Sequence, residues 1–376
     1  MLELIRRHQP ISRADLARLT GVFRSSVSDI VDELLEDGLL WEARDTSQRG
    51  RGRVPMILHL NEASCHVLGL NIRPIYSQLA YAGLSGEIRE TLLFDTPTSA
   101  QQLVGVVSKA IWEMSERLGR KPDSYQRLGI AIPGHVDAVT GRILWLPTHE
   151  ELSEFSITQE LECKTGIPAL ADNDCNLGAL SELWLSKKTI NDRNSDFVFL
   201  NISDFGTGAG VVVNGEIYLG HDSRFAAEVG HMIVEPSGLE CLCGRHGCWE
   251  MYVSNNATWK RVNPEQAFRE DKFGELLAAA TRGEQREWAA LQETARYLSL
   301  GISNIGFIFN PAEIVVAGRI SQVWDLIREQ VKLRYGSKHL PHAVRPARLS
   351  ADDSLLHGAI CLALREVFAG PKFGPS

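Results

Sequence analysis

Residues 228–250 read EVGHMIVEPSGLECLCGRHGCWE, and this stretch is the most informative part of the 376-residue chain. It brings one imidazole and three thiols into a short segment, the ligand set of a closed tetrahedral zinc site: His231, Cys241, Cys243 and Cys248. Gly244 and Gly247 lie inside the cysteine loop, where a chain that wraps an ion needs positive φ or close backbone approach. The plainer interpretation is a few buried thiols beside a core histidine. Because three of the seven cysteines fall within eight residues, we expect Zn²⁺ in a structural role, with no open position for water.

Two carboxylates, Glu228 and Glu250, flank the predicted zinc loop. Carboxylates beside a fixed imidazole suit a polyol, because its hydroxyls need hydrogen-bond partners. We expect His231 to bind zinc through one ring nitrogen and to offer the other N–H to a ligand hydroxyl, with the metal fixing its tautomer and direction. The segment therefore predicts a structural metal and part of a binding site.

The first sixty residues predict a winged helix-turn-helix. A short helix stops before Pro10, Ser12 caps a second helix with Asp15 in an imperfect capping box, and a turn follows at Thr20-Gly21. A third helix then runs to Gly38. Its exposed face near the N-terminus is expected to meet base edges of DNA. The residues of that face are Arg24, Ser25, Ser26, Ser28 and Asp29.

Two apolar runs, 39–43 and 54–60, enclose an arginine- and glycine-rich segment and predict a β-hairpin wing. Glycines let the backbone approach DNA, and arginines fit a narrow minor groove. The arginines expected to bind DNA are Arg49, Arg51 and Arg53. A solvated linker, or a helical module that binds protein, is the alternative. The helix-turn-helix directly before the wing favours DNA.

A weak internal repeat begins after residue 63. Leu70-Asn71-Ile72 and Leu200-Asn201-Ile202 each start a strand, a turn and a second strand, with tight reversals at Ser85-Gly86 and Asn214-Gly215. Each copy leads into a longer α/β stretch, which predicts two related lobes. Apolar periodicity predicts long helices near 99–118, 287–309 and 353–368.

The segment from Glu228 to Glu250 resembles the signature of the ROK family of sugar kinases and sugar-responsive transcription factors. The resemblance covers nearly the whole chain. It implies an α/β, actin-like (ribonuclease H-like), two-lobed sugar-kinase fold after the winged helix-turn-helix. The expected domains are a DNA-binding domain at 1–62, a first lobe at 63–185 completed by a C-terminal helix at 352–370, and a second lobe with the zinc loop at 186–351.

The resemblance also implies a sugar site. In kinases of the family, the aspartate at the position of Asp174 takes the proton from the sugar hydroxyl, and the asparagine before it holds neighbouring hydroxyls. An N-cap followed by a turn is the alternative interpretation of Asn173-Asp174, since Asn and Asp favour both. The residues that the resemblance assigns to sugar are Gly134, Asn173, Asp174, Glu228, His231 and Glu250.

Kinase activity requires a phosphate cradle as well as a base. The family's kinases have Asp-x-Gly-Gly-Thr where this chain has Asn71 to Tyr76. The neutral Asn71 therefore stands in place of the aspartate, and other residues replace both glycines. The glycine-rich run Gly206 to Gly210 remains, but it equally suits a tight strand connection. Ala317-Gly318-Arg319 replaces a glycine pair at the nucleotide end. We therefore expect the chain to have no enzyme activity. Within the family it resembles the xylose-repressor and N-acetylglucosamine-repressor type of transcription factor.

Composition agrees with an intracellular regulator. The chain has 44% hydrophobic and 23% charged residues, a net charge of −8, no apolar run long enough to span a membrane and no signal-peptide layout. Clustered cysteines favour a reducing cytoplasm. We expect operator DNA, a sugar or sugar-phosphate effector and a homodimer or homotetramer. A functional sugar kinase with an added DNA-binding domain is the alternative.

Overall fold

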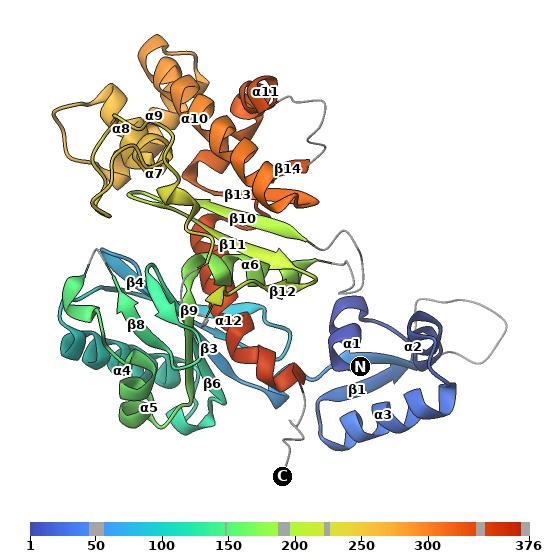
Figure 1. Ribbon diagram of the computed structural model, residues 1–376. Coiled ribbons are helices and arrows are strands. Elements are labelled where there is room, and N and C mark those ends of the chain that lie inside the picture. The colour runs from blue at the N-terminus through green and yellow to red at the C-terminus, as the bar shows by residue number, and fades with distance from the viewer. Residues whose placement is uncertain (45–55, 147–148, 187–195, 222–225, 336–342, 370–376) are drawn as a thin grey trace. The chain divides into compact units, whose positions relative to one another are not determined.

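The computed structural model describes residues 1–44, 56–146, 149–186, 196–221, 226–335 and 343–369 (Figure 1). The chain divides into two compact units, each built from separate segments. Unit 1 comprises Met1–Ile130, Ser156–Ala171 and the chain from Ala359 onward, and unit 2 comprises Ala131–Phe155 and Asp172–Gly358. None of the described helices is both long and apolar enough to cross a membrane.

Unit 1 begins with the predicted winged helix-turn-helix elements: α1 (Leu2–His8), α2 (Arg13–Thr20), α3 (Arg24–Glu36), β1 (Leu40–Arg44) and β2 (Met56–Leu60). Ser12 and Asp15 form the predicted capping box at the start of α2. Gly21 then reverses the chain with a φ of 68°, a conformation that glycine adopts without strain. β1 and β2 pair antiparallel, which confirms the hairpin.

The first sheet also lies mainly in unit 1 and has the order β5-β4-β3-β6-β9. Its strands are β3 (Val67–Asn71), β4 (Tyr76–Ala82), β5 (Ile88–Asp95), β6 (Arg127–Ile132) and β9 (Ala169–Asn173). The associated helices are α4 (Ala100–Arg117), α5 (Ile157–Thr165) and α12 (Ala351–Ala369). Glycine is needed where α12 meets the sheet, because a Cβ on Gly129 would lie 2.0 Å from the carbonyl oxygen of Ala359.

Unit 2 contains the second sheet, whose order is β12-β11-β10-β13-β14. Its strands are β10 (Phe197–Ile202), β11 (Thr207–Val213), β12 (Glu216–Ile217), β13 (Glu313–Gly318) and β14 (Ala343–Pro346). When the strands are numbered within each copy, both sheets have the order 3-2-1-4-5. In each copy the first two strands pair antiparallel. The internal repeat is therefore confirmed.

The remaining elements of unit 2 carry the site and its support. They are the hairpin β7 (His135–Asp137) and β8 (Arg142–Trp145), and the helices α6 (Asp174–Leu185), α7 (Glu250–Val253), α8 (Asn255–Val262), α9 (Glu270–Thr281), α10 (Gln285–Phe309) and α11 (Trp324–Tyr335). Helix α10 was predicted at 287–309 and α12 at 353–368, so the apolar periodicity located both helices to within two residues at each end.

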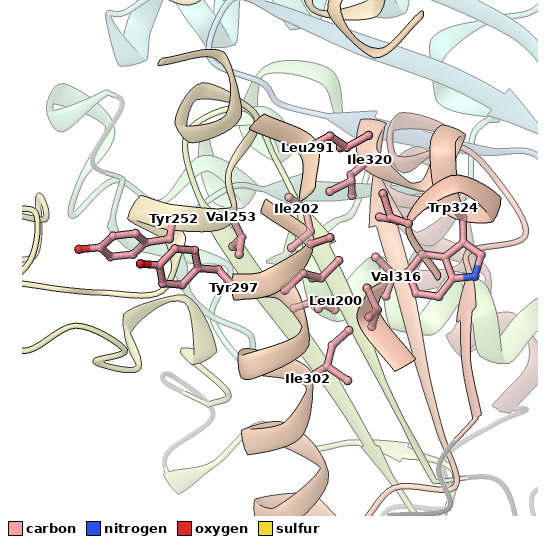
Figure 2. Close-up of a cluster of buried hydrophobic side chains, with 14 of the residues drawn as sticks. Leu200, Ile202, Tyr252, Val253, Leu291, Tyr297, Ile302, Val316, Ile320 and Trp324 are labelled. Atoms are coloured by element: carbon pink, nitrogen blue, oxygen red, sulfur yellow. The ribbon is translucent and has the colours of Figure 1, made fainter. Parts of the chain in front are cut away.

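Helix α10 packs against the second sheet through a closed apolar core (Figure 2). Leu200 and Val316 from the strands, and Leu291 and Ile302 from the helix, have no exposed surface. Burying a side chain of this size contributes about 1.5–3 kcal/mol. The core therefore fixes the sheet that carries the chain into the cysteine loop.

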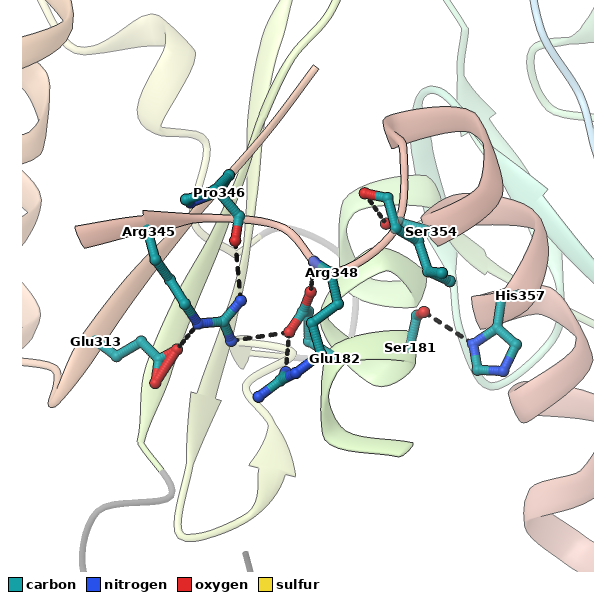
Figure 3. Close-up of polar contacts among 9 residues, drawn as sticks. Ser181, Glu182, Glu313, Arg345, Pro346, Arg348, Ser354 and His357 are labelled. Atoms are coloured by element: carbon teal, nitrogen blue, oxygen red, sulfur yellow. Dashed lines mark hydrogen bonds and ion pairs between the residues drawn. The ribbon is translucent and has the colours of Figure 1, made fainter. Parts of the chain in front are cut away.

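A buried carboxylate joins α6 to β14 and to the chain that follows it (Figure 3). Glu182 is 2% exposed. It accepts hydrogen bonds of 2.8 Å from Nη2 of Arg345 and from the backbone N–H of Arg348, and it also pairs with the Arg348 guanidinium. A buried charge is tolerated when it is paired and hydrogen-bonded in this way. The contacts fix α6, whose first turn belongs to the candidate site.

Candidate functional site

The predicted metal ligands lie together in unit 2. One donor atom from each of His231, Cys241, Cys243 and Cys248 lies within 4.8 Å of every other. Nδ1 of His231 is 3.7 Å from Sγ of Cys241, and the sulfurs of Cys243 and Cys248 are 3.5 Å apart. Two sulfurs at about 2.3 Å from a tetrahedral zinc would be about 3.8 Å apart. The donor set and spacing therefore fit a metal ion of this size.

The fold of the loop explains how four ligands converge. Gly244 and Gly247 have φ values of 81° and 76°, as the sequence predicted. A Cβ on Gly247 would lie 1.7 Å from the carbonyl oxygen of Glu235, so only glycine fits there. Directly after the last cysteine, the fully buried Trp249 donates from Nε1 to the carbonyl of Tyr297 at 2.7 Å. The loop is thereby anchored to α10.

The thiols differ in their ease of ionisation. Burial raises the pKa of Cys241 well above its usual range, and the adjacent Glu250 adds to this rise. Burial opposes ionisation of Cys243 as well. Hydrogen bonds from the backbone and side chain of Arg245 and from the neighbouring thiols nevertheless lower the pKa of Cys243 to about 6. These contacts therefore favour the thiolate of Cys243, which is the form that binds metal.

Glu250 touches two of the four ligands. Its Oε1 lies 2.9 Å from Sγ of Cys241 and 3.4 Å from Nδ1 of His231. On the other side, its Oε2 lies 3.4 Å from the point where a Cβ on Gly230 would stand. The position of this carboxylate is therefore linked to the ligand cluster, as expected of a group that orients a metal ligand.

A separate hollow of about 310 Å³, partly open to solvent, lies among other predicted residues of unit 2. Of the predicted sugar contacts, Gly134, Asn173 and Glu228 line it. Asp174, His231 and Glu250 are not among its lining residues. The other lining residues, which were not among the predicted sugar contacts, are His135, Val136, Asp172, Asn176, Leu219 and Ala226.

The side chain of Asn173 is partly committed to the fold. Its Oδ1 accepts hydrogen bonds from the backbone N–H groups of Cys175 and Asn176 and so caps α6. Its Nδ2 donates to the carbonyl oxygen of Gly134 at 3.0 Å. The N-cap that the sequence left as an alternative is therefore present. One side-chain N–H of Asn173 remains for a ligand.

Asp174 begins α6 directly after that cap. Its carboxylate interacts with the thiol of Cys175, whose pKa is raised first by burial and then by Asp174. Asn176 donates from Nδ2 to Oδ1 of Asp172 at 3.0 Å. Acidic and amide groups thus cluster where β9 ends and α6 begins, the usual place for functional groups in α/β folds.

Side chains pack closely in the segment to which the family resemblance assigns the kinase phosphate cradle. The guanidinium of Arg73 lies 4.4 Å from the centre of the Tyr76 ring and also bonds to its hydroxyl. Ile72 is 1% exposed, and Asn71 is fully buried at the end of β3. These groups replace the glycines that would let a phosphate approach the backbone.

Packing also explains the retained glycine-rich run and the altered motif at the nucleotide end. Gly208 and Gly210 lie within β11, where a Cβ would stand 2.6 Å from Sγ and 2.3 Å from the carbonyl oxygen of Cys175. These glycines therefore let α6 approach the strand. Arg319, which replaces a glycine, forms ion pairs with Asp204, at 3.8 Å, and with Glu270.

Only some of the residues predicted to contact DNA are exposed on the described part of the winged helix-turn-helix. Arg24, Ser25 and Ser26 are exposed at the start of α3, whereas Ser28 is half-buried and its carbonyl accepts a hydrogen bond from Arg13. The wing arginines lie outside the described residues: Arg49, Arg51 and Arg53.

Comparison with known proteins agrees with this geometry. A family model described as the ROK family matches residues 68–366, which begin after the winged helix-turn-helix. The xylose repressor of Bacillus spizizenii is 26% identical over 346 residues, covering 91% of this chain and 86% of the repressor.

Two solved structures have the same fold. A ROK family transcriptional regulator, homologous to the E. coli MLC protein, is similar with a TM-score of 0.76 and 24% identity, covering 96% of this chain and 94% of that one. A ROK family glucokinase from Streptomyces griseus, in complex with glucose and AMPPNP, has a TM-score of 0.69 and 25% identity. It covers 80% of this chain and 99% of its own. The likeness to the regulator therefore extends over more of this chain than the likeness to the kinase.

Proposed function

Because the chain belongs to the ROK family, we propose that it is a sugar-responsive transcriptional repressor without kinase activity. One observation carries the proposal. A winged helix-turn-helix and a polar hollow belong to the same chain, whereas side chains occupy the place of the kinase phosphate cradle. The similarity to a xylose repressor along 91% of the chain supports the same function. Sugar regulates DNA binding here by favouring one arrangement of the protein over another.

The hollow suits a ligand rich in hydroxyl groups. Among its described lining residues are two carboxylates, two side-chain amides and one imidazole, and no lysine or arginine. Such groups accept and donate hydrogen bonds to hydroxyls, whereas carboxylates repel a phosphate. We therefore propose a neutral or amino sugar as the effector. Asp174, His231 and Glu250 belong to the proposed sugar contacts with Gly134, Asn173 and Glu228.

The cysteine cluster holds a structural Zn²⁺ in this proposal. The support is the donor set of His231 and the three cysteines, with the tetrahedral spacing described above. Zinc stiffens the loop that joins His231 to Glu250 and thereby fixes the direction of the His231 ring.

The proposed domains follow the family's pattern. Residues 1–62 bind DNA, residues 63–185 with 352–370 form one lobe, and residues 186–351 form the other with the zinc loop. A symmetric homodimer or homotetramer would bind palindromic operator DNA with half-sites about one helical turn apart.

The test combines DNA binding, effector binding and ATP turnover. DNA selected from a random duplex library should bind the full-length protein, and one free sugar from a panel should release it. Replacing Arg49, Arg51 and Arg53 with alanine should weaken binding to all sequences and reduce the salt dependence by about one unit of slope per lost phosphate contact. Sugar-dependent ATP hydrolysis by the wild type would instead establish the kinase alternative.

A further inference from the structure

An exposed aromatic side chain stands at the start of the recognition helix. Phe23 is 85% exposed and directly precedes α3. The adjacent Val22 is also exposed, as are Arg24, Ser25 and Ser26 on the first turn. In a helix-turn-helix, this end of the second helix approaches base edges in the major groove. The apolar side chain therefore lies on the surface that DNA would cover.

Phe23 contributes little to the isolated fold. It occupies the N-cap position of α3 and makes no side-chain capping hydrogen bond, although serine, threonine, aspartate or asparagine would stabilise a helix there. Its ring buries little surface, so it also gains little from the hydrophobic effect. The residue therefore has a local cost that contact with a partner would offset.

An exposed carboxylate shares one face of α3 with two exposed serines. Asp29 lies three and four residues after Ser26 and Ser25, so the three side chains share one helical face. Two nearby acids, Asp32 and Glu42, pair with Arg13. Among the described residues, Asp29 has no such ion pair. A free carboxylate close to DNA is repelled by phosphates unless a base offers it a donor.

We propose that Phe23 contacts the C5-methyl group of a thymine and that Asp29 accepts a hydrogen bond from the N4 amino group of a cytosine in the major groove. The proposal rests on the DNA-binding function above and deepens it by naming what the helix reads. Phenylalanine is suited to the thymine methyl, and aspartate to the cytosine amino group. Phe23 is the N-cap of α3 and Asp29 lies in the N-terminal half of the same helix, so the two bases lie in the same half-site.

The first test removes the methyl group from the DNA. Full-length protein is used to select a binding sequence from random duplex DNA, and each thymine of the half-site is then replaced in turn by uracil. Uracil pairs like thymine and lacks only the methyl. At one position, wild type should bind uracil DNA about three- to tenfold more weakly, because one apolar base contact is lost. Phe23→Ala should bind both DNAs equally, while Leu19→Ala, a change at an exposed position on α2, should still distinguish them.

The second test examines base preference. Asp29→Ala should relax the choice of base at one cytosine by roughly tenfold or more, without a uniform loss of affinity. Glu36→Ala removes the same charge from an exposed position at the far end of α3 and should leave the preference unchanged.

The outcomes separate this proposal from the function on which it rests. If no sequence is enriched from the library, DNA recognition itself is wrong. If a sequence is enriched but wild type is indifferent to every thymine methyl, the role of Phe23 is overturned. If Asp29→Ala and Glu36→Ala change base preference alike, the role of Asp29 is overturned. The uracil test on wild type does not depend on the folding of any variant.

Discussion

Nε2 of His135 lies 3.1 Å from Oε1 of Glu228, and both residues line the hollow of unit 2. The neutral imidazole must carry its proton on Nε2 to donate to this carboxylate. Trp145 packs against the other part of the histidine, with ring centres 5.1 Å apart. His135 therefore holds one oxygen of Glu228 in place and leaves the other carboxylate oxygen for a ligand.

Loss of this contact should weaken binding of the effector. We expect His135→Ala to lower affinity for the inducing sugar by roughly three- to tenfold, the value of one lost hydrogen bond. Isothermal titration calorimetry with the full-length protein would measure it. Val139→Ala, at the exposed turn of the same hairpin, is the matched control. Unchanged affinity in His135→Ala would show that the pair has no role in ligand binding.

Asp174 provides a test of sensing without turnover. Asp174→Ala should lower the affinity for sugar by roughly tenfold to a hundredfold, because a hydrogen bond to a charged group contributes about 1.5–3 kcal/mol. Operator affinity without sugar should change little. Asp271→Ala, which removes an exposed carboxylate on α9, should alter neither. The measurement is operator binding by each variant with and without sugar. If sugar releases Asp174→Ala from the operator as readily as it releases wild type, Asp174 does not bind sugar.

Metal content tests the cysteine cluster. Purified protein should contain one tightly held Zn²⁺ per chain, and Cys243→Ser should lose it. Cys243→Ser should lower the free energy of unfolding by about 2–5 kcal/mol, which lowers Tm by roughly 5–15 °C in a domain of this size. Cys163→Ser, an exposed cysteine on α5, should keep both metal and Tm. Wild type that lacks stoichiometric metal after gentle purification would refute the site.

Two glycines should respond to alanine in opposite directions. A Cβ on Gly301 of α10 would lie 2.0 Å from the ring of Trp249, whereas Gly274 of α9 has open space. Gly301→Ala should therefore destabilise by about 1–3 kcal/mol through overpacking. Gly274→Ala should stabilise by about 0.5–1 kcal/mol, because glycine is unfavourable inside a helix. Urea unfolding of each variant measures the change. Equal effects would show that the Trp249 ring does not pack closely against Gly301.

The sequence by itself determined what local spacing encodes. The ligands of the cysteine loop lie within one short segment, so their convergence follows from chain length and two positive-φ glycines. The capping box at Ser12, the hairpin of the wing and the limits of α10 likewise depend on neighbouring residues. The repeated strand pattern was also sufficient to predict two related sheets, because each copy carries its own turn signals.

Only the tertiary structure decided which distant residues meet. His135 and Glu228 belong to separate segments, and nothing in the spacing of either predicts their contact. The commitment of Asn173 to the α6 cap and to Gly134, and the pairing of Arg319 with Asp204, likewise depend on how strands bring their ends together. The glycines of β11 suggested a phosphate loop until the packing of α6 explained them. Short-range geometry is set by the backbone, whereas long-range contacts are set by which apolar faces pack, and one sequence without that packing does not specify them.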